Sequence, residues 1–187
     1  MRIIAGSARG TRLGPVPAGV RPVSDRAREG VFASLGSTVP DARCLDLYAG
    51  TGAMGIEALS RGADSCTFVE RSRAAVATIR DNLSRARLSE AAAVRSAEVG
   101  AFLRRRPDGP AGFDLVFLDP PYQTPSSDIE HRLGDLAAGW LAPEGWTVVL
   151  TRGHKGDPPS LPVHWAVRRS LRYGDSLLTL YREDRWA

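Results

Sequence analysis

The chain has 187 residues, of which 43% are hydrophobic and 25% are charged, and its formal net charge is +4. These proportions are typical of globular proteins and exclude global disorder, while the length suits one domain with a short extension. No apolar run approaches the roughly 20 residues that span a bilayer, and the first residues lack the apolar core of a secretion signal. We therefore expect a soluble, cytoplasmic protein with no membrane partner.

Glycine and proline punctuate the first 20 residues, which predicts a small β-hairpin or arm that precedes the main domain. We expect this basic arm to cover residues 1–20 and the domain to cover residues 21–187. Ser24 is a credible N-cap for an amphipathic helix from Asp25 to Leu35, because Ala27, Val31 and Leu35 recur at helical spacing.

Apolar strand-like runs and helical patterns then alternate along most of the chain. The expected strands are Cys44 to Leu47, Cys66 to Val69, Ala91 to Val94, Phe113 to Leu118 and Trp146 to Leu150. The expected helices are Met54 to Ser60, Arg73 to Ala86, Val99 to Arg105 and Ile129 to Trp140. This alternation predicts a doubly wound, Rossmann-like α/β sheet with helices on both faces.

Two further strand candidates close the chain. They are Val163 to Leu171 and Ser176 to Tyr181, and a turn at Tyr173-Gly174-Asp175 joins them. Because so short a turn joins antiparallel strands, we expect a terminal antiparallel hairpin that brings the sheet to about seven strands.

Positive charge is concentrated at the start of the chain. Residues 1–30 contain six arginines and two acidic residues, which accounts for the whole net charge of +4. Lys155 is the one lysine among the 25 basic residues, so nearly all positive groups are guanidinium groups, which suit phosphate and stack on bases. We therefore predict that the N-terminal block contacts the substrate, and the candidate residues are Arg2, Arg9, Arg12, Arg21, Ser24 and Arg28.

Cysteine and histidine usage favours no metal site. Cys44 and Cys66 are too few for a disulfide framework or a cysteine-rich metal site. His131, His154 and His164 have no metal-ligand spacing with one another or with the cysteines. The sequence therefore predicts two buried thiols and no bound metal.

A glycine motif follows the first expected strand and opens a helix. Gly50, Gly52 and Gly55 match G-x-G-x-x-G, the pattern of loops that bind nucleotide cofactors. Asp46 lies four residues before Gly50, where a carboxylate would repel a pyrophosphate and attract an ammonium group; S-adenosylmethionine has an amino group and a sulfonium but no phosphate. Glu70 ends the second strand, where a carboxylate can bind ribose hydroxyls. The motif therefore favours S-adenosylmethionine over a dinucleotide.

A second motif, Asp119-Pro120-Pro121-Tyr122, ends the fourth expected strand. Ligands of open α/β folds bind at this carboxyl edge of the sheet, and proline makes the chain turn there. The exocyclic amine of a planar base is a poor nucleophile, since its lone pair is delocalised into the ring. The Asp119 carboxylate and the Pro120 carbonyl can accept its N–H bonds, while Tyr122 stacks on the extruded base. These four residues are the predicted catalytic site.

Both motifs resemble motifs I and IV of the S-adenosylmethionine-dependent amino-methyltransferases. Together with Met1-Arg2-Ile3-Ile4-Ala5-Gly6, the stretch from Arg21 to Glu29 and the stretch from Leu45 to Gly52, they resemble the RsmD family of bacterial 16S rRNA guanine-N2 methyltransferases. The resemblance spans nearly the whole chain, including Tyr173-Gly174-Asp175.

The resemblance implies a class I methyltransferase that uses S-adenosyl-L-methionine. Its substrate would be one guanine of 16S rRNA within the small ribosomal subunit, with possible contacts to ribosomal proteins, and we expect a monomer. The implied cofactor-binding residues are Asp46, Tyr48, Gly50, Thr51, Gly52, Glu70, Arg71, Ala97, Glu98 and Asp119.

The chain departs from the family pattern at two positions. Ala97-Glu98-Val99 stands where the family often has an aspartate, and Thr151 stands where the fifth strand often ends in glutamate. Three alternatives stay open at this point: an N6-adenine nucleic-acid methyltransferase, a dinucleotide-dependent oxidoreductase, and a non-catalytic RNA-binding assembly factor with the same fold.

Overall fold

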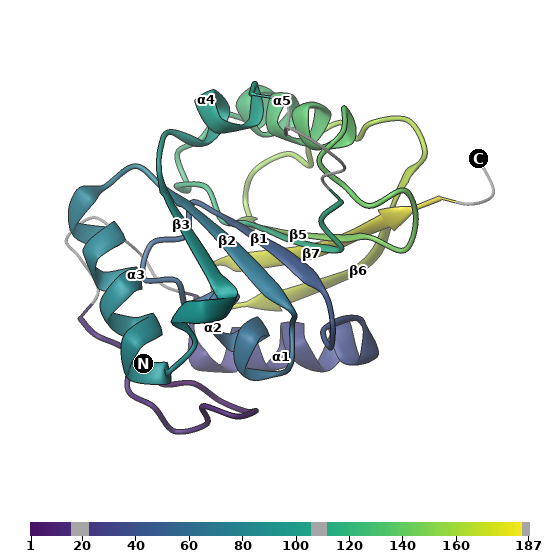
Figure 1. Ribbon diagram of the computed structural model, residues 1–187. Coiled ribbons are helices and arrows are strands. Elements are labelled where there is room, and N and C mark those ends of the chain that lie inside the picture. The colour runs from purple at the N-terminus through teal and green to yellow at the C-terminus, as the bar shows by residue number, and fades with distance from the viewer. Residues whose placement is uncertain (16–22, 106–111, 185–187) are drawn as a thin grey trace.

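A single sheet of seven strands forms the centre of the described protein, in the order β3-β2-β1-β4-β5-β7-β6 (Figure 1). The computed structural model describes residues 1–15, 23–105 and 112–184. The parallel strands are β1 (Arg43–Leu47), β2 (Ser65–Glu70), β3 (Ala92–Ser96), β4 (Leu115–Leu118) and β5 (Thr147–Gly153). The antiparallel hairpin consists of β6 (Trp165–Tyr173) and β7 (Ser176–Glu183), and β7 pairs with β5. The predicted doubly wound sheet with a terminal hairpin is confirmed.

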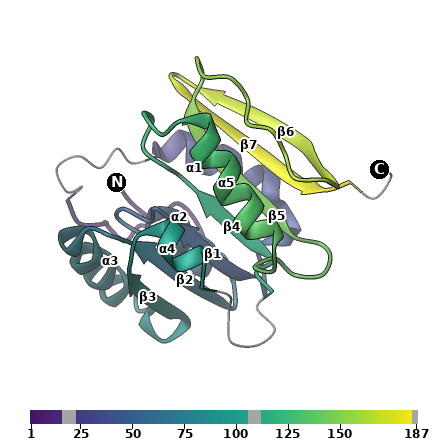
Figure 2. The same cartoon turned by 90° about the horizontal axis from the view of Figure 1, so that it is seen from above.

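Helices cover both faces of the sheet, as Figures 1 and 2 show. One face carries α1 (Asp25–Leu35), α2 (Ala53–Ser60) and α3 (Arg73–Ala86), and the other carries α4 (Val99–Leu103) and α5 (Ser126–Ala137). Short 3₁₀ turns at Gly36–Thr38 and Ser89–Ala91 follow α1 and α3. Strand β4 explains the two-sided core: Leu115 and Phe117 face the first layer, while Val116 and Leu118 face the second.

The element boundaries differ from the predicted ones where tertiary contacts decide them. Helix α5 was expected over Ile129 to Trp140 but begins directly after Pro125 and ends at Ala137. Trp140 instead belongs to the core, and its indole donates a hydrogen bond to the Leu103 carbonyl at 2.9 Å. Strand β5 runs on to Gly153, beyond the expected end at Leu150, because its last residues pair with β7.

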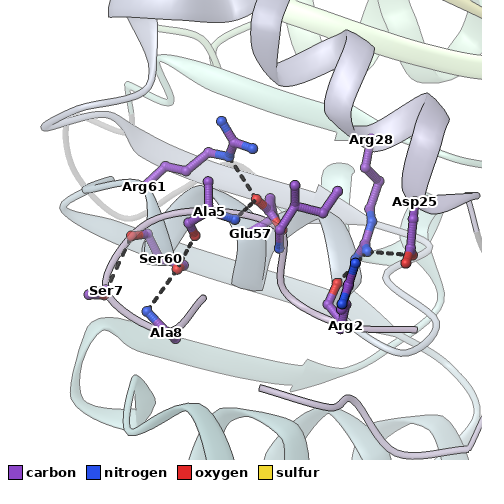
Figure 3. A network of polar contacts seen from close by, with 10 residues as sticks. Arg2, Ala5, Ser7, Ala8, Asp25, Arg28, Glu57, Ser60 and Arg61 are labelled. Carbon is purple, nitrogen blue, oxygen red and sulfur yellow. Dashed lines mark hydrogen bonds and ion pairs between the residues drawn. The ribbon is translucent and has the colours of Figure 1, made fainter. Parts of the chain in front are cut away.

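Residues 1–15, hereafter the N-terminal segment, form a hairpin-like loop on the outside of α2. Arg2 bridges Arg12, and Ile3 is buried. The carboxylate of Glu57, itself fully buried, accepts hydrogen bonds from the backbone N–H groups of Ile4 at 2.8 Å and Ala5 at 3.1 Å (Figure 3). Because a buried carboxylate needs such partners, the segment is part of the helical layer. The expected boundary between residues 20 and 21 lies outside the described residues.

Candidate functional site

A cavity of about 490 Å³ opens at the carboxyl ends of β1, β2 and β4, and both sequence motifs line it. Its walls include twelve of the thirteen predicted cofactor-binding and catalytic residues: Asp46, Tyr48, Gly50, Thr51, Glu70, Arg71, Ala97, Glu98, Asp119, Pro120, Pro121 and Tyr122. Gly52, the thirteenth, is not among the lining residues and is the N-cap of α2. The volume falls within the range of small-molecule and cofactor sites.

Glycine shapes the wall formed by residues 48–52, hereafter the glycine loop. Gly52 has φ +77° and starts α2, a conformation that a residue with a side chain rarely adopts. The third glycine of the motif has a packing role, because a Cβ at Gly55 would lie 2.4 Å from the ring of Phe68. Gly55 therefore lets α2 pack directly on β2.

Asp46 lies at the floor of the cavity and is almost completely buried. Its Oδ2 accepts a hydrogen bond from the Gly55 backbone N–H at 2.9 Å. Burial raises the pKa of Asp46 well above its ordinary value, and the negative charges of Asp119 and Glu70 raise it further. Four carboxyl side chains and one arginine line the cavity, an acidic excess that favours a cationic ligand.

Glu70 holds the glycine loop in place. Its Oε2 accepts from the Gly50 backbone N–H at 3.0 Å, and its Oε1 accepts from the Ser72 backbone N–H at 2.8 Å. Each carboxylate oxygen can accept more than one hydrogen bond, so both retain capacity for ribose hydroxyls. The loop is consequently shaped before any ligand enters.

Glu98 has a local structural role that the sequence did not reveal. Its two carboxylate oxygens accept hydrogen bonds from the backbone N–H groups of Gly100 at 2.8 Å and Ala101 at 2.7 Å, which makes it the N-cap of α4. These hydrogen bonds, the one from Gly100 above all, lower the pKa of Glu98. The exposed Glu98 thus lines the cavity rim with both oxygens already engaged.

Asp119 follows the last residue of β4, the strand that pairs with β1. Leu118 of β4 is in register with Leu150 of β5, so the next residues along the two strands, Asp119 and Thr151, lie beside each other. Burial raises the pKa of Asp119 to about 7, while a hydrogen bond with the Thr151 side chain lowers it. A carboxyl group with this pKa can gain or lose a proton near neutral pH.

Tyr122 is anchored at the rim on the side of the C-terminal hairpin. Its hydroxyl shares a hydrogen bond with the Ser176 hydroxyl at the start of β7. The chain turns through the prolines, since the Thr124 backbone N–H donates to the Pro121 carbonyl at 2.8 Å. The partly exposed ring of Tyr122 therefore stands in the cavity wall on a fixed support.

The predicted substrate-binding residues do not share one environment. Arg2, Arg9 and Arg12 are exposed and form no ion pair with another described side chain. Ser24 caps α1 by accepting from the Ala27 backbone N–H at 3.2 Å. Arg21 lies outside the described residues.

Arg28 differs from its predicted role as a substrate contact, because its side chain is fully buried. Its Nη2 donates to the Arg2 carbonyl at 2.6 Å and to Asp25 Oδ1 at 2.8 Å (Figure 3). Burial lowers the pKa of Arg28, whereas Asp25 and then Glu57 raise it. In this arrangement Arg28 joins α1 to the N-terminal segment and offers no free guanidinium to RNA.

Several cavity residues were not among the predicted site residues. They are Val23, Ala49, Ala53, Met54, Ser72, Val99 and Gln123. Most adjoin a predicted residue in sequence, so proximity to the motifs could have indicated them. Val23 adjoins Ser24, a predicted substrate-binding residue, and it brings the block before β1 into the cavity wall.

The described residues provide neither a metal centre nor a membrane-spanning helix. They contain no group of three or more histidine, cysteine, aspartate or glutamate side chains placed to hold a metal ion. No described helix is long and apolar enough to cross a membrane.

The fold and the cavity define a class I methyltransferase, in which a glycine loop follows β1 and Asp-Pro-Pro-Tyr follows β4. The family model described as Conserved hypothetical protein 95 matches residues 1–182. The chain belongs to this family, as the resemblance to RsmD proteins indicated.

Relatives named as methyltransferases match most of the chain. This chain is 36% identical over 187 residues to the ribosomal RNA small subunit methyltransferase D of Escherichia coli strain K12. The match covers 98% of this chain and 90% of the relative. The putative rRNA methyltransferase YlbH of Bacillus subtilis is 40% identical over 124 residues, or 66% of this chain and 67% of the relative. The solved structure of the putative methyltransferase yhhF from Escherichia coli has a TM-score of 0.85, with 35% identity and 98% coverage of both chains.

Proposed function

We propose that the protein transfers a methyl group from S-adenosylmethionine to the exocyclic N2 amine of a guanine in small-subunit rRNA. The observation that carries this proposal is that one cavity is lined both by the glycine loop with Asp46 and Glu70 and by the motif from Asp119 to Tyr122. The relative from Escherichia coli is named for small-subunit rRNA, which supports the substrate class. The N-terminal block that resembles RsmD proteins supports guanine as the base.

S-adenosylmethionine fits the chemistry of the cavity walls. Asp46 and the surrounding acidic groups suit its ammonium and sulfonium, and Glu70 suits the ribose hydroxyls. We assign the adenine to the end of the cavity that Arg71, Ala97 and Glu98 line. When bound, this cofactor supplies an electrophilic methyl group and leaves as a neutral thioether.

The residues at the end of β4 prepare the amine. The ionised Asp119 carboxylate and the Pro120 carbonyl accept the two N–H bonds of the amine, which directs its lone pair toward the methyl carbon. A new N–C bond forms as the S–C bond breaks, and the surplus amine proton passes to Asp119, whose pKa of about 7 suits that transfer. Tyr122 stacks on the flipped base, and alignment supplies most of the rate enhancement.

The exposed arginines of the N-terminal segment suit the phosphate backbone of the substrate. Arg2, Arg9 and Arg12 carry charge that no described acidic side chain neutralises. Each phosphate that they neutralise would add nearly one unit to the salt dependence of binding to a duplex. We place this contact on the assembled small subunit in the cytoplasm, where a monomer of the protein could also touch ribosomal proteins.

The decisive experiment is a methyl-transfer assay with labelled S-adenosylmethionine. The substrates are small subunits that lack the modification and naked 16S rRNA, followed by digestion to nucleosides and mass identification. We expect N2-methylguanosine, and Asp119→Ala should lower the turnover by at least a hundredfold, while exposed Asp81→Ala keeps it. N6-methyladenosine would replace the proposed base, and absence of any labelled nucleoside would refute the activity.

A further inference from the structure

One buried amide joins the N-terminal segment to the glycine loop. Asn82 lies on α3, and its side chain is completely buried. Its Nδ2 donates to the Thr51 carbonyl at 2.9 Å, and its Oδ1 accepts from the Gly14 backbone N–H at 2.6 Å. The partners fix the orientation of the amide, because a carbonyl can only accept and an N–H can only donate.

Both ends of this bridge lie at functional positions. Thr51 belongs to the glycine loop and lines the cavity. Gly14 follows Arg12 by two residues, and Leu13 between them is buried. Arg12 in turn stands opposite Arg2, which places two exposed like charges side by side. A phosphate bound between these two guanidinium groups would relieve their repulsion. The backbone from Arg12 to Gly14 would then shift.

A second path joins the same two parts of the protein through α2. Gly55 in the first turn of α2 donates its N–H to Asp46, and Glu57 one residue beyond Ile56 holds the backbone of Ile4. The N-terminal segment is therefore connected to the cavity lining at two points, to Asp46 of β1 through α2 and to Thr51 of the glycine loop through Asn82. Breaking either bond of Asn82 would leave a buried polar group without a partner, so the two ends are expected to move together.

We propose that Asn82 is a positioning residue that couples the N-terminal segment to the glycine loop, so that RNA held by the segment tightens cofactor binding. This inference rests on the proposed function, because it requires that the segment binds rRNA and that the loop binds the cofactor. Coupling of this kind is reciprocal, so a bound cofactor tightens RNA binding by the same factor.

The test measures the dissociation constant of S-adenosylhomocysteine, which avoids turnover, with and without saturating unmethylated small subunits. The wild-type protein should bind it at least fivefold more tightly when the subunits are present. Asn82→Leu removes both hydrogen bonds at similar volume and should bring the ratio close to one. Asp81→Asn, at the exposed neighbouring position, should keep the wild-type ratio.

A second pair of variants tests the same bridge from its other end without altering α3. Gly14→Pro removes the backbone N–H that donates to Asn82 Oδ1. Gly14→Ala keeps this N–H and places a Cβ 3.3 Å from Asn82 Oδ1. Gly14→Pro should abolish the coupling and Gly14→Ala should retain it. If Asn82→Leu does not fold, as thermal unfolding would reveal, the Gly14 pair decides.

A wild-type ratio of one, or a wild-type ratio that persists in Gly14→Pro, would overturn the inference. Neither result affects the proposed function, which the labelled methyl assay tests separately on the wild-type protein. A merely structural Asn82 would lower the thermal transition and weaken cofactor binding equally with and without subunits, leaving the ratio unchanged.

Discussion

Asp119→Asn should stabilise the folded protein at alkaline pH while it removes the proposed catalytic carboxylate. The pKa of Asp119 rises from 3.8 to about 7 on folding, mainly because of burial. A raised folded-state pKa means that stability is fully present below pH 4 and is lost as the pH rises through 7. The neutral amide keeps the shape and a partner for Thr151 but never takes on the buried charge.

The pKa shift sets the size of the effect. The rise of the Asp119 pKa from 3.8 to about 7 corresponds to about 4 kcal/mol. Because Asp119 is partly exposed to the cavity, water there screens its charge, and we expect about 1 to 3 kcal/mol above pH 8. Asp46 titrates in both proteins, so comparing the variant with the wild type cancels most of its contribution.

Urea unfolding of both proteins at pH 5, 6, 7 and 8 measures this difference. The advantage of Asp119→Asn should reach about 40% of its full size at pH 5 and should grow with pH until it levels off above 7. An exposed-site variant, Asp81→Asn, should show no such trend. A difference between Asp119→Asn and wild type that stays constant with pH, or a wild type that is the more stable protein at pH 8, would refute the assigned pKa.

Three other changes have definite expected outcomes. Thr151→Val removes a hydrogen bond that lowers the pKa of Asp119, so the rising limb of the methyl-transfer rate against pH should move to higher pH. Thr151→Ser keeps a hydroxyl and should return the limb to its wild-type position. A limb that does not move in Thr151→Val would contradict the contact between Thr151 and Asp119. Gly55→Ala places a Cβ 2.4 Å from the Phe68 ring and should lower the free energy of unfolding by about 1 to 3 kcal/mol in urea titrations. The control variant Gly134→Ala, whose Cβ meets open space, should show no such loss. Asp46→Asn should weaken S-adenosylmethionine binding by about 1.5 to 3 kcal/mol in calorimetry, and unchanged affinity would remove Asp46 from the cofactor site.

The sequence was sufficient for the sheet and the two motifs because their signals are local. Strands such as Leu115–Leu118 are continuously apolar, which is what burial on both faces requires. The glycine motif and Asp119-Pro120-Pro121-Tyr122 each follow a strand, and parallel strands place their carboxyl ends at one edge. The convergence of both motifs on one cavity therefore needed no long-range information.

The buried polar contacts of the N-terminal segment could not be predicted in this way. Glu57 and Ser60 lie in α2, and nothing nearby in sequence indicates that residues 4–8 cover them. The sequence predicts that Arg28 contacts RNA, because charged side chains are rarely buried without a partner and its partners are not evident in the sequence. Its partners are Asp25 and the Arg2 backbone, and the latter lies 26 residues away in the sequence.

The strand order has a consequence for how the chain acquires its shape during synthesis. Strand β7, the last to be made, inserts between β5 and β6, which are both made earlier. Until β7 emerges, β5 presents an unpaired edge, and β6 has no neighbour in the sheet. The nascent chain is therefore exposed to edge-to-edge aggregation until β7 has left the ribosome, and removing β7 would leave both β5 and β6 with an unpaired edge.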